Sequence, residues 1–291
     1  MLIELGGQTL DATDQCLVMG ILNVATDSPV SDSVVDVGDA PRRAAALREA
    51  GAAMIDVGAQ STRTGAAQVS VDQEIARVVP VIESLVAEGH LVSVDTWTAA
   101  VARAAVAAGA HLINDITGAD PETVEVAVET HTPIAVMHMR GRPQRHREVA
   151  HQYEDVATEV RQYLGGRASE IQAAGAPAVW IDPGFQFGRG LDDNLRLLLD
   201  IPKLAELGHP VLISASRKGF LAEMLGHGAL RSHDAQGQPG MIEATIAFNV
   251  LAAWMGAHVV RVHDVEGVAW ALNVSTAARA LQRRDRSERA R

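Results

Sequence analysis

The chain has 291 residues, a formal net charge of −11 and no stripe of Lys and Arg interleaved with aromatic residues before its C-terminal tail, which argues against nucleic acid as a partner. Apolar residues make up 47% and charged residues 21% of the chain, as is usual for a folded globular protein. No apolar run approaches the roughly 20 residues of a membrane span, no secretion signal is recognisable, and the single Cys16 excludes an internal disulfide. We therefore expect a soluble, cytoplasmic protein.

Short apolar, β-branched runs alternate with alanine-rich segments of helical spacing along the whole chain. The runs predict eight strands, at residues 16–23, 52–58, 91–95, 111–115, 133–138, 178–184, 210–216 and 258–264. The segments between them predict eight helices, at residues 41–50, 70–88, 99–108, 122–129, 153–174, 194–207, 220–225 and 241–255. Several of these helices are followed by a glycine, as expected for a left-handed cap, at Gly51, Gly89, Gly109, Gly175, Gly208 and Gly256.

The order strand, loop, helix, strand repeats without a linker or a break in composition. This repeat fits a single-domain (β/α)₈ TIM barrel, for which about 250 residues is typical, better than a doubly wound sheet. No Gly-x-Gly-x-x-Gly motif follows the first run, which also argues against a doubly wound sheet. We expect the barrel to span residues 1–280, with a polar connecting loop at 225–244 and a frayed, solvated tail at 281–291.

In such barrels the active site lies at the C-terminal ends of the strands, and here the predicted strands end in polar residues. Asp95, Asn114 and Asp182 supply acceptors and donors of the kind that hold a flat heterocycle. A second, mainly cationic group suits an anion such as a diphosphate, with a metal ion as an option. Its members are Asn23, Arg63, Lys218, Arg261 and His263. The sequence thus predicts a cavity that holds a ring on one side and a phosphate group on the other.

Two other kinds of chemistry stay open from the residues alone. Lys218, near the end of the seventh predicted strand, is a candidate nucleophile for Schiff-base formation, provided that its pKa is lowered. A metal hydrolase would use His138 and His263, the histidines near strand ends, although neither lies in an HxH or HExxH motif. The residues favour ring and phosphate binding over both alternatives.

Motifs at the strand ends resemble dihydropteroate synthases, in the order and spacing of that family and over nearly the whole chain. They read MGILNVATDS (19–28), IDVGAQSTRTGA (55–66), SVDT (93–96), NDITG (114–118), MHMRGRP (137–143), IDPGFQFGRG (181–190), SRKGF (216–220) and RVHDV (261–265). The resemblance implies a (β/α)₈ barrel, usually a homodimer, that condenses 6-hydroxymethyl-7,8-dihydropterin diphosphate with p-aminobenzoate. It further implies that Mg²⁺ assists, that the pterin diphosphate ionises before the arylamine attacks, and that dihydropteroate and pyrophosphate are released.

The resemblance also implies roles for individual residues. The pterin contacts would be Asp95, Asn114, Met137, Asp182, Lys218 and Arg261. The diphosphate contacts would be Asn23, Arg63, Arg261 and His263, with Asn23 as the metal ligand. The catalytic residues would be Asp27, Arg63 and Lys218. The acceptor pocket would contain Thr62, Thr64, Phe187 and Gly219.

The chain departs from the family pattern mainly on the acceptor side. The first loop (25–33) lacks the phenylalanine of the usual Thr-Pro-Asp-Ser-Phe-Ser-Asp-Gly-Gly, and Thr64 replaces a proline. The usual Asp-Pro-Gly-Ile-Gly-Phe-Gly-Lys becomes Asp-Pro-Gly-Phe-Gln-Phe-Gly-Arg at 182–189. Gly219 replaces a serine that helps to hold the carboxylate of p-aminobenzoate. We expect backbone amides exposed at Gly219 to compensate, and Gly219→Ser to lower the KM for p-aminobenzoate.

Three functions are consistent with this pattern. The first is an authentic dihydropteroate synthase with an unusual acceptor pocket. The second is a paralogue that transfers the pterin to a different nucleophile. The third is a noncatalytic pterin-binding protein.

Overall fold

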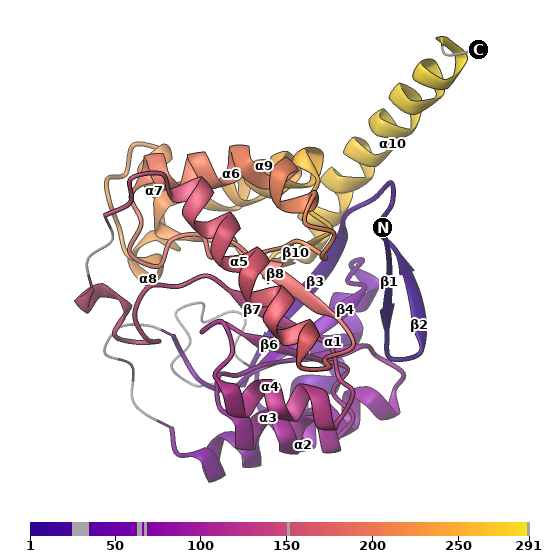
Figure 1. Cartoon of the computed structure of the whole chain (residues 1–291), viewed down its shortest axis with the longest axis vertical. Coiled ribbons are helices and arrows are strands. Elements are labelled where there is room, and N and C mark those ends of the chain that lie inside the picture. Colours follow the sequence, from indigo (N-terminus) through magenta and orange to yellow (C-terminus); the bar gives the residue numbers. More distant parts are fainter. Residues whose placement is uncertain (25–34, 63–65, 67–68, 150–151, 290–291) are drawn as a thin grey trace.

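The computed structural model describes residues 1–24, 35–62, 66, 69–149 and 152–289. Within them, eight parallel strands pair in the order β8-β7-β6-β5-β4-β3-β10-β9. A parallel bridge between Ile181 and Val211 joins the two ends of this order, so the sheet closes into a barrel. Figure 1 shows the helices lying around the outside of the strands. The predicted single-domain (β/α)₈ barrel is therefore confirmed.

The barrel strands lie within the predicted runs. They are β3 (Leu17–Asn23), β4 (Met54–Gly58), β5 (Val92–Asp95), β6 (Leu112–Asp115), β7 (Ile134–Met137), β8 (Val179–Asp182), β9 (Leu212–Ile213) and β10 (Val259–Val262). β9 is much shorter than the predicted run at 210–216. Pro210 has no N–H to donate to a ladder, and only its carbonyl takes part, accepting from Ile181 N at 2.9 Å.

Eight of the covering helices lie in the predicted order, whereas the helices at 232–235 and 265–289 were not predicted. The covering helices are α1 (Ala40–Glu49), α2 (Val71–Ala87), α3 (Ala99–Ala107), α4 (Pro121–Glu129), α5 (Val156–Ala173), α6 (Leu191–Ala205), α7 (Gly219–Met224), α8 (Ser232–Ala235), α9 (Met241–Met255) and α10 (Val265–Arg289), with 3₁₀ turns η2 (Val37–Asp39) and η3 (His146–Glu148). The predicted glycine caps have φ between 79° and 116°, which only glycine adopts without strain. In the described part of the chain, no helix has the length and apolar character to cross a membrane. The cytoplasmic location stays a prediction.

An N-terminal hairpin was not expected from the sequence. β1 (Leu2–Leu5) and β2 (Gln8–Asp11) pair antiparallel around Gly6 and Gly7, whose φ values of 57° and 72° suit a tight turn. Ile3 on β1 is buried in the same apolar cluster as residues of the barrel interior. The hairpin therefore covers one end of the barrel.

Two polar segments are more ordered than expected. The predicted loop at 225–244 contains α8, and residues after 280 continue α10 as far as Arg289 instead of fraying. Figure 1 shows this end of α10 projecting away from the barrel. Arg, Gln and Ala are good helix formers, so a segment without apolar periodicity can still extend an existing helix.

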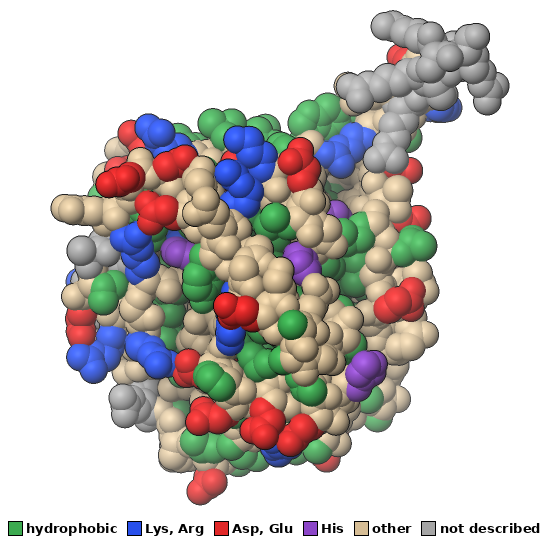
Figure 2. All heavy atoms as spheres, in the orientation of Figure 1, with side chains coloured by type: hydrophobic (Ala, Val, Ile, Leu, Met, Phe, Trp, Pro, Cys, Tyr) green, Lys and Arg blue, Asp and Glu red, His purple; other side chains and the backbone are tan. Residues whose placement is uncertain are grey.

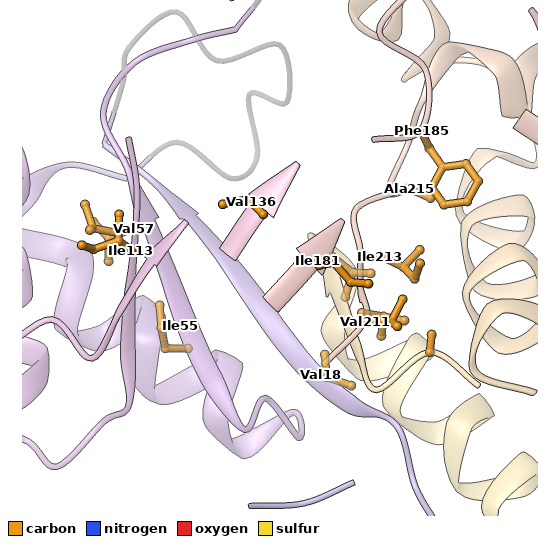
Figure 3. Packing of buried hydrophobic residues seen from close by; sticks show 14 of the residues in the cluster. Val18, Ile55, Val57, Ile113, Val136, Ile181, Phe185, Val211, Ile213 and Ala215 are labelled. Carbon is orange, nitrogen blue, oxygen red and sulfur yellow. The ribbon is translucent and has the colours of Figure 1, made fainter. Parts of the chain in front are cut away.

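Alternation along the strands divides the apolar core in two. Outward-facing residues pack beneath the helices, as Figure 3 shows for Val18, Ile113 and Ile181. Inward-facing residues form a separate cluster inside the barrel, which includes Met19, Met54, Leu112, Ala135, Trp180 and Val259. Because this cluster lies toward the N-terminal ends of the strands, side chains two residues further along each strand face the C-terminal end.

Candidate active site

The strand register gathers the predicted polar residues at the C-terminal end of the barrel. Asn23 on β3 pairs with Gly58 on β4, which pairs with Asp95 on β5. Asp95 pairs in turn with Asn114 on β6, so the three polar residues lie at the same height in the barrel. Met137 on β7 pairs with Asp182 on β8, and both are predicted pterin contacts. The register thus brings the polar side chains of Asn23, Asp95, Asn114 and Asp182 to the same end of the barrel.

Arg261 is the centre of this polar cluster. It comes two residues after the inward-facing Val259 on β10, so its side chain points into the barrel. Its Nε donates to Asp56 Oδ2 at 2.5 Å, and one Nη donates to Asp95 Oδ2 at 2.6 Å. Asn114 Nδ2 donates to the same Asp56 oxygen at 3.3 Å. Asp56 is fully buried, and sequence reasoning did not include it among the site residues.

The carboxyl groups of Asp95 and Asp182 are in surroundings that disfavour their charge. Burial raises the pKa of Asp95 to about 7, although Arg261 opposes the shift. Burial likewise raises the pKa of Asp182 to about 6, although its Oδ1 accepts a hydrogen bond from Gly184 N at 2.7 Å. The Oδ1 of Asp95 is buried and accepts from no described residue. Because a buried acceptor without a donor costs about 1–3 kcal/mol, this oxygen indicates a place for a ligand N–H.

Lys218 lies between this carboxylate cluster and an apolar wall. Burial, and then the like charge of Arg261, lowers the pKa of Lys218 to about 8. Its Nζ stands 4.5 Å from the ring centroid of Phe187. Phe187 packs in a small buried cluster with Met137 and Met139. A planar ring bound at the strand ends would therefore have polar partners on its edge and apolar partners on its face.

His263 closes the other side of the cluster. Its Nδ1 lies 2.9 Å from Ser216 Oγ, which also accepts from the backbone N of His263 at 3.2 Å. Burial, and then the charge of Arg261, lowers the pKa of His263 well below its usual value, so the ring is neutral at neutral pH. A groove of about 520 Å³ opens beside His263, between α1 and the start of α10, with Arg43 in its lining. His263 and Ser216 offer hydrogen-bonding groups on this side of the cluster, and the groove beside them is lined by the carboxylates of Glu49, Asp264 and Glu266 as well as by Arg43.

The remaining predicted residues are placed as follows. Asp27, Arg63 and Thr64 lie outside the described residues. Thr62 lies in the loop after β4 and is partly buried. The metal-hydrolase alternative is not supported at His138, whose Nδ1 contacts a guanidinium nitrogen of Arg189. Within the described ranges, no three His, Cys, Asp or Glu side chains are close enough together to hold a metal ion.

Gly219 occupies a position where a side chain has no room. A Cβ there would stand 2.0 Å from the backbone oxygen of Leu230 and 2.9 Å from Gln186 Nε2. The backbone amide of Phe220 is not exposed for a ligand either, because it donates to Gln186 Oε1 at 3.0 Å. The expectation that serine at 219 improves acceptor binding is therefore wrong in its premise, since the hydroxyl cannot be added without moving the backbone around Leu230.

Gly219→Ser is expected to lower the free energy of unfolding by about 1–3 kcal/mol, the usual cost of overpacking. Denaturant unfolding followed by circular dichroism measures the change. Gly237→Ser is the matched control, because a Cβ at Gly237 meets no heavy atom within 4 Å. Equal stability of the two variants would contradict the steric argument.

Comparisons with known proteins agree with this geometry. A family model described as pterin binding enzyme matches residues 19–263. The dihydropteroate synthase of Escherichia coli K12 is 38% identical over 277 residues, which cover 93% of this chain and 94% of that protein. The dihydropteroate synthase of Mycobacterium leprae is 40% identical over 265 residues, which cover 88% of this chain and 91% of that protein.

Solved structures show the same likeness over the whole barrel. Yersinia pestis dihydropteroate synthase, in a sulfonamide drug complex, has a TM-score of 0.86 and 34% identity, and the match covers 97% of this chain and 100% of that chain. Xanthomonas albilineans dihydropteroate synthase, in complex with 7,8-dihydropteroate, has a TM-score of 0.81 and 35% identity, with 96% and 99% covered. The matches in sequence and in structure, together with the ring-and-anion cluster at the strand ends, show that this chain belongs to the dihydropteroate synthase family of pterin-binding enzymes.

Proposed function

We propose that the protein is a dihydropteroate synthase, which joins 6-hydroxymethyl-7,8-dihydropterin diphosphate to p-aminobenzoate in folate biosynthesis. The observation that carries the proposal is the buried Oδ1 of Asp95, which lacks a donor among the described residues and adjoins Arg261. A pterin edge offers N–H donors to such an oxygen and acceptors to Asn114 and Lys218. Relatives crystallised with 7,8-dihydropteroate and with 4-aminobenzoate support the same substrates here.

The carboxylates fit a reaction that passes through a cation. The bond between the pterin methylene carbon and the diphosphate oxygen breaks first, and the electron pair leaves with the diphosphate. The methylene carbon is left with a positive charge that is delocalised into the ring. The carboxyl groups of Asp182 and Asp95 stabilise that charge as it develops. The arylamine nitrogen then attacks the methylene carbon and releases a proton, without a covalent bond to the protein.

Arg261 and His263 suit the leaving group. Arg261 supplies a fixed positive charge, and the neutral His263, oriented by Ser216, adds a hydrogen-bonding ring without a charge. The sequence-based proposal of Arg63 for the same anion falls outside the described residues. Positive and polar groups that are already in place stabilise the departing diphosphate without reorganising.

We propose Mg²⁺ as the cofactor, with Asn23 as its protein ligand. Mg²⁺ prefers oxygen ligands, and it usually takes one or two from the protein and the rest from substrate phosphates and water. The Oδ1 of Asn23 and the Oδ2 of Asp95 each lie 3.6 Å from the position of a Cβ on Gly58, so both oxygens stand beside one point at the barrel mouth. The Asp95 Oδ2 is already engaged by Arg261, so the Asn23 oxygen is the one that supports the proposal. Bound there, Mg²⁺ would neutralise charge on the diphosphate.

A product assay tests the proposed function. The purified protein is incubated with dihydropterin diphosphate, Mg²⁺ and p-aminobenzoate, and pyrophosphate and dihydropteroate are quantified separately. Equal formation of both products is the expected result. Pyrophosphate without dihydropteroate would instead indicate a paralogue with another acceptor, and binding without turnover would indicate a noncatalytic pterin-binding protein.

We further propose that the protein is a homodimer that pairs through α9 and α10. Trp270, Val274 and Leu281 are 64%, 72% and 54% exposed, and their spacing places them on one side of α10. Trp254 on α9 is 43% exposed, and Figure 2 shows hydrophobic side chains along the upper edge of the molecule, over α9 and the start of α10. Exposed apolar patches of this kind mark protein interfaces.

The homodimer predicts a mass in solution of about twice 30.8 kDa by light scattering. Trp270→Glu should shift the protein to the monomer, because it places a charge in the proposed interface. Leu2→Glu, at an equally exposed position on β1, is the control and should leave the mass unchanged. A monomeric wild type would rule out this surface as a stable interface.

A further inference from the structure

Gln186, between β8 and α6, has a side chain that is fixed at one end and free at the other. Its backbone N donates to Asn194 Oδ1 at 2.7 Å, and its Oε1 accepts from Phe220 N at 3.0 Å. Gln186 also has a φ of 78°, a left-handed conformation that is uncommon outside glycine. Because the amide oxygen faces the N–H of Phe220, the orientation of the carboxamide is settled and the Nε2 group must point elsewhere.

The free end of Gln186 lies beside the proposed acceptor site. The Nε2 of Gln186 is 2.9 Å from the position that a Cβ on Gly219 would take. The amide therefore occupies the space that a side chain at position 219 would need. The next residue is Phe187, whose ring lies under the Nζ of Lys218. Among the residues that the structure describes, none accepts a hydrogen bond from Gln186 Nε2.

We propose that Gln186 determines the acceptor specificity of this protein, by donating its Nε2–H to the carboxylate of the arylamine. The proposal rests on the proposed function. An arylamine that packs on Phe187 with its nitrogen toward the pterin points its para substituent away from the pterin. Gln186 lies next in sequence to that ring with an uncommitted donor, on the side of Gly219, whereas the Nζ of Lys218 beside the same ring is assigned to the pterin; two N–H groups on one nitrogen suit a carboxylate. The hydrogen bond from Phe220 N, beside the buried Phe187 and Gly219, keeps the amide in place.

Gln186→Glu tests the proposal with little structural change. The variant keeps the volume of the side chain and the oxygen that accepts from Phe220 N, but it replaces the donor by a second carboxylate oxygen. The Kd of p-aminobenzoate is measured by calorimetry on protein saturated with dihydropterin, pyrophosphate and Mg²⁺, and the KM is measured by turnover. Both constants should rise about 10- to 100-fold, the effect of losing one hydrogen bond to a charged group.

A neutral acceptor separates recognition from general damage. For p-aminobenzamide, which can donate to the new carboxylate, the constants should stay the same or fall. Gln8→Glu, which adds the same charge on the exposed β2, should leave Kd and KM unchanged for both acceptors. The proposal is overturned if Gln186→Glu leaves p-aminobenzoate unaffected, if both acceptors weaken equally, or if wild-type protein does not bind p-aminobenzoate. Normal binding without turnover in the wild type would instead overturn the proposed function alone.

Discussion

Lys218→Ala is expected to raise the Kd for dihydropterin diphosphate about 100-fold, which corresponds to roughly 2.7 kcal/mol and lies within the range for hydrogen bonds to a charged group. The ammonium, like the guanidinium of Arg261, interacts electrostatically with both Asp95 and Asp182. Its loss removes a donor to the pterin and leaves the two carboxylates with less compensating charge. Calorimetric titration with the pterin diphosphate in the presence of Mg²⁺ measures the change.

The composition of the chain provides the control. Its two lysines are Lys218 and Lys203, and Lys203 is 64% exposed on α6. Lys203→Ala should leave pterin affinity within about twofold, since an exposed side chain away from the cluster contributes little. Unchanged affinity in Lys218→Ala would mean that the pterin binds elsewhere.

The lowered pKa of Lys218 adds a pH signature to the same experiment. Because the ammonium form binds, pterin affinity should fall as the pH rises through about 8, and this alkaline loss should disappear in Lys218→Ala. Carbon-13 labelled lysine gives two side-chain signals, one for each lysine, so the titration of Lys218 can be followed directly. A Lys218 signal that titrates near pH 10.5 would contradict the assigned surroundings.

The barrel was predictable because its signals are local and repeated. Glycine caps such as Gly51 and Gly256 mark helix ends within a few residues, and β-branched runs mark strands. The hairpin was missed because its strands are short and half exposed, although Gly6-Gly7 is a recognisable hairpin turn. The whole of α10 was missed, although Val265, Val268 and Leu272 have helical spacing, and its solvated end lacks apolar periodicity.

The site was predictable only in part, because its closest contacts join residues far apart in the sequence. Asp56 and Arg261 are separated by 205 residues, and nothing in the run around Asp56 shows that an arginine will meet it across the barrel. The same limit applies to Gly219. Its motif shows that a hydroxyl is missing, but only the structure shows that Gln186 and the carbonyl of Leu230 fill the space.

Arg261→Met is expected to lower the free energy of unfolding by about 3–5 kcal/mol at neutral pH, the usual cost of removing one partner of a buried ion pair. Methionine keeps much of the apolar volume but removes the guanidinium that contacts Asp56 and Asp95. These carboxylate side chains are 0% and 15% exposed, so water cannot replace the lost cation well. Denaturant unfolding at several pH values measures the loss.

The control and the pH dependence separate this effect from a general loss of packing. Arg42→Met breaks an ion pair with Asp39 whose side chains are 82% and 58% exposed, and it should cost less than about 1 kcal/mol. Without Arg261, which opposes the rise in the pKa of Asp95, that folded-state pKa rises further, so the folded variant binds more protons than the unfolded chain. The deficit of Arg261→Met should therefore shrink as the pH falls.

Adding Asp56→Asn should recover part of the stability, because it removes a charge that has lost its partner. A deficit that is independent of pH and unchanged by Asp56→Asn would show that Arg261 contributes by packing and not by charge.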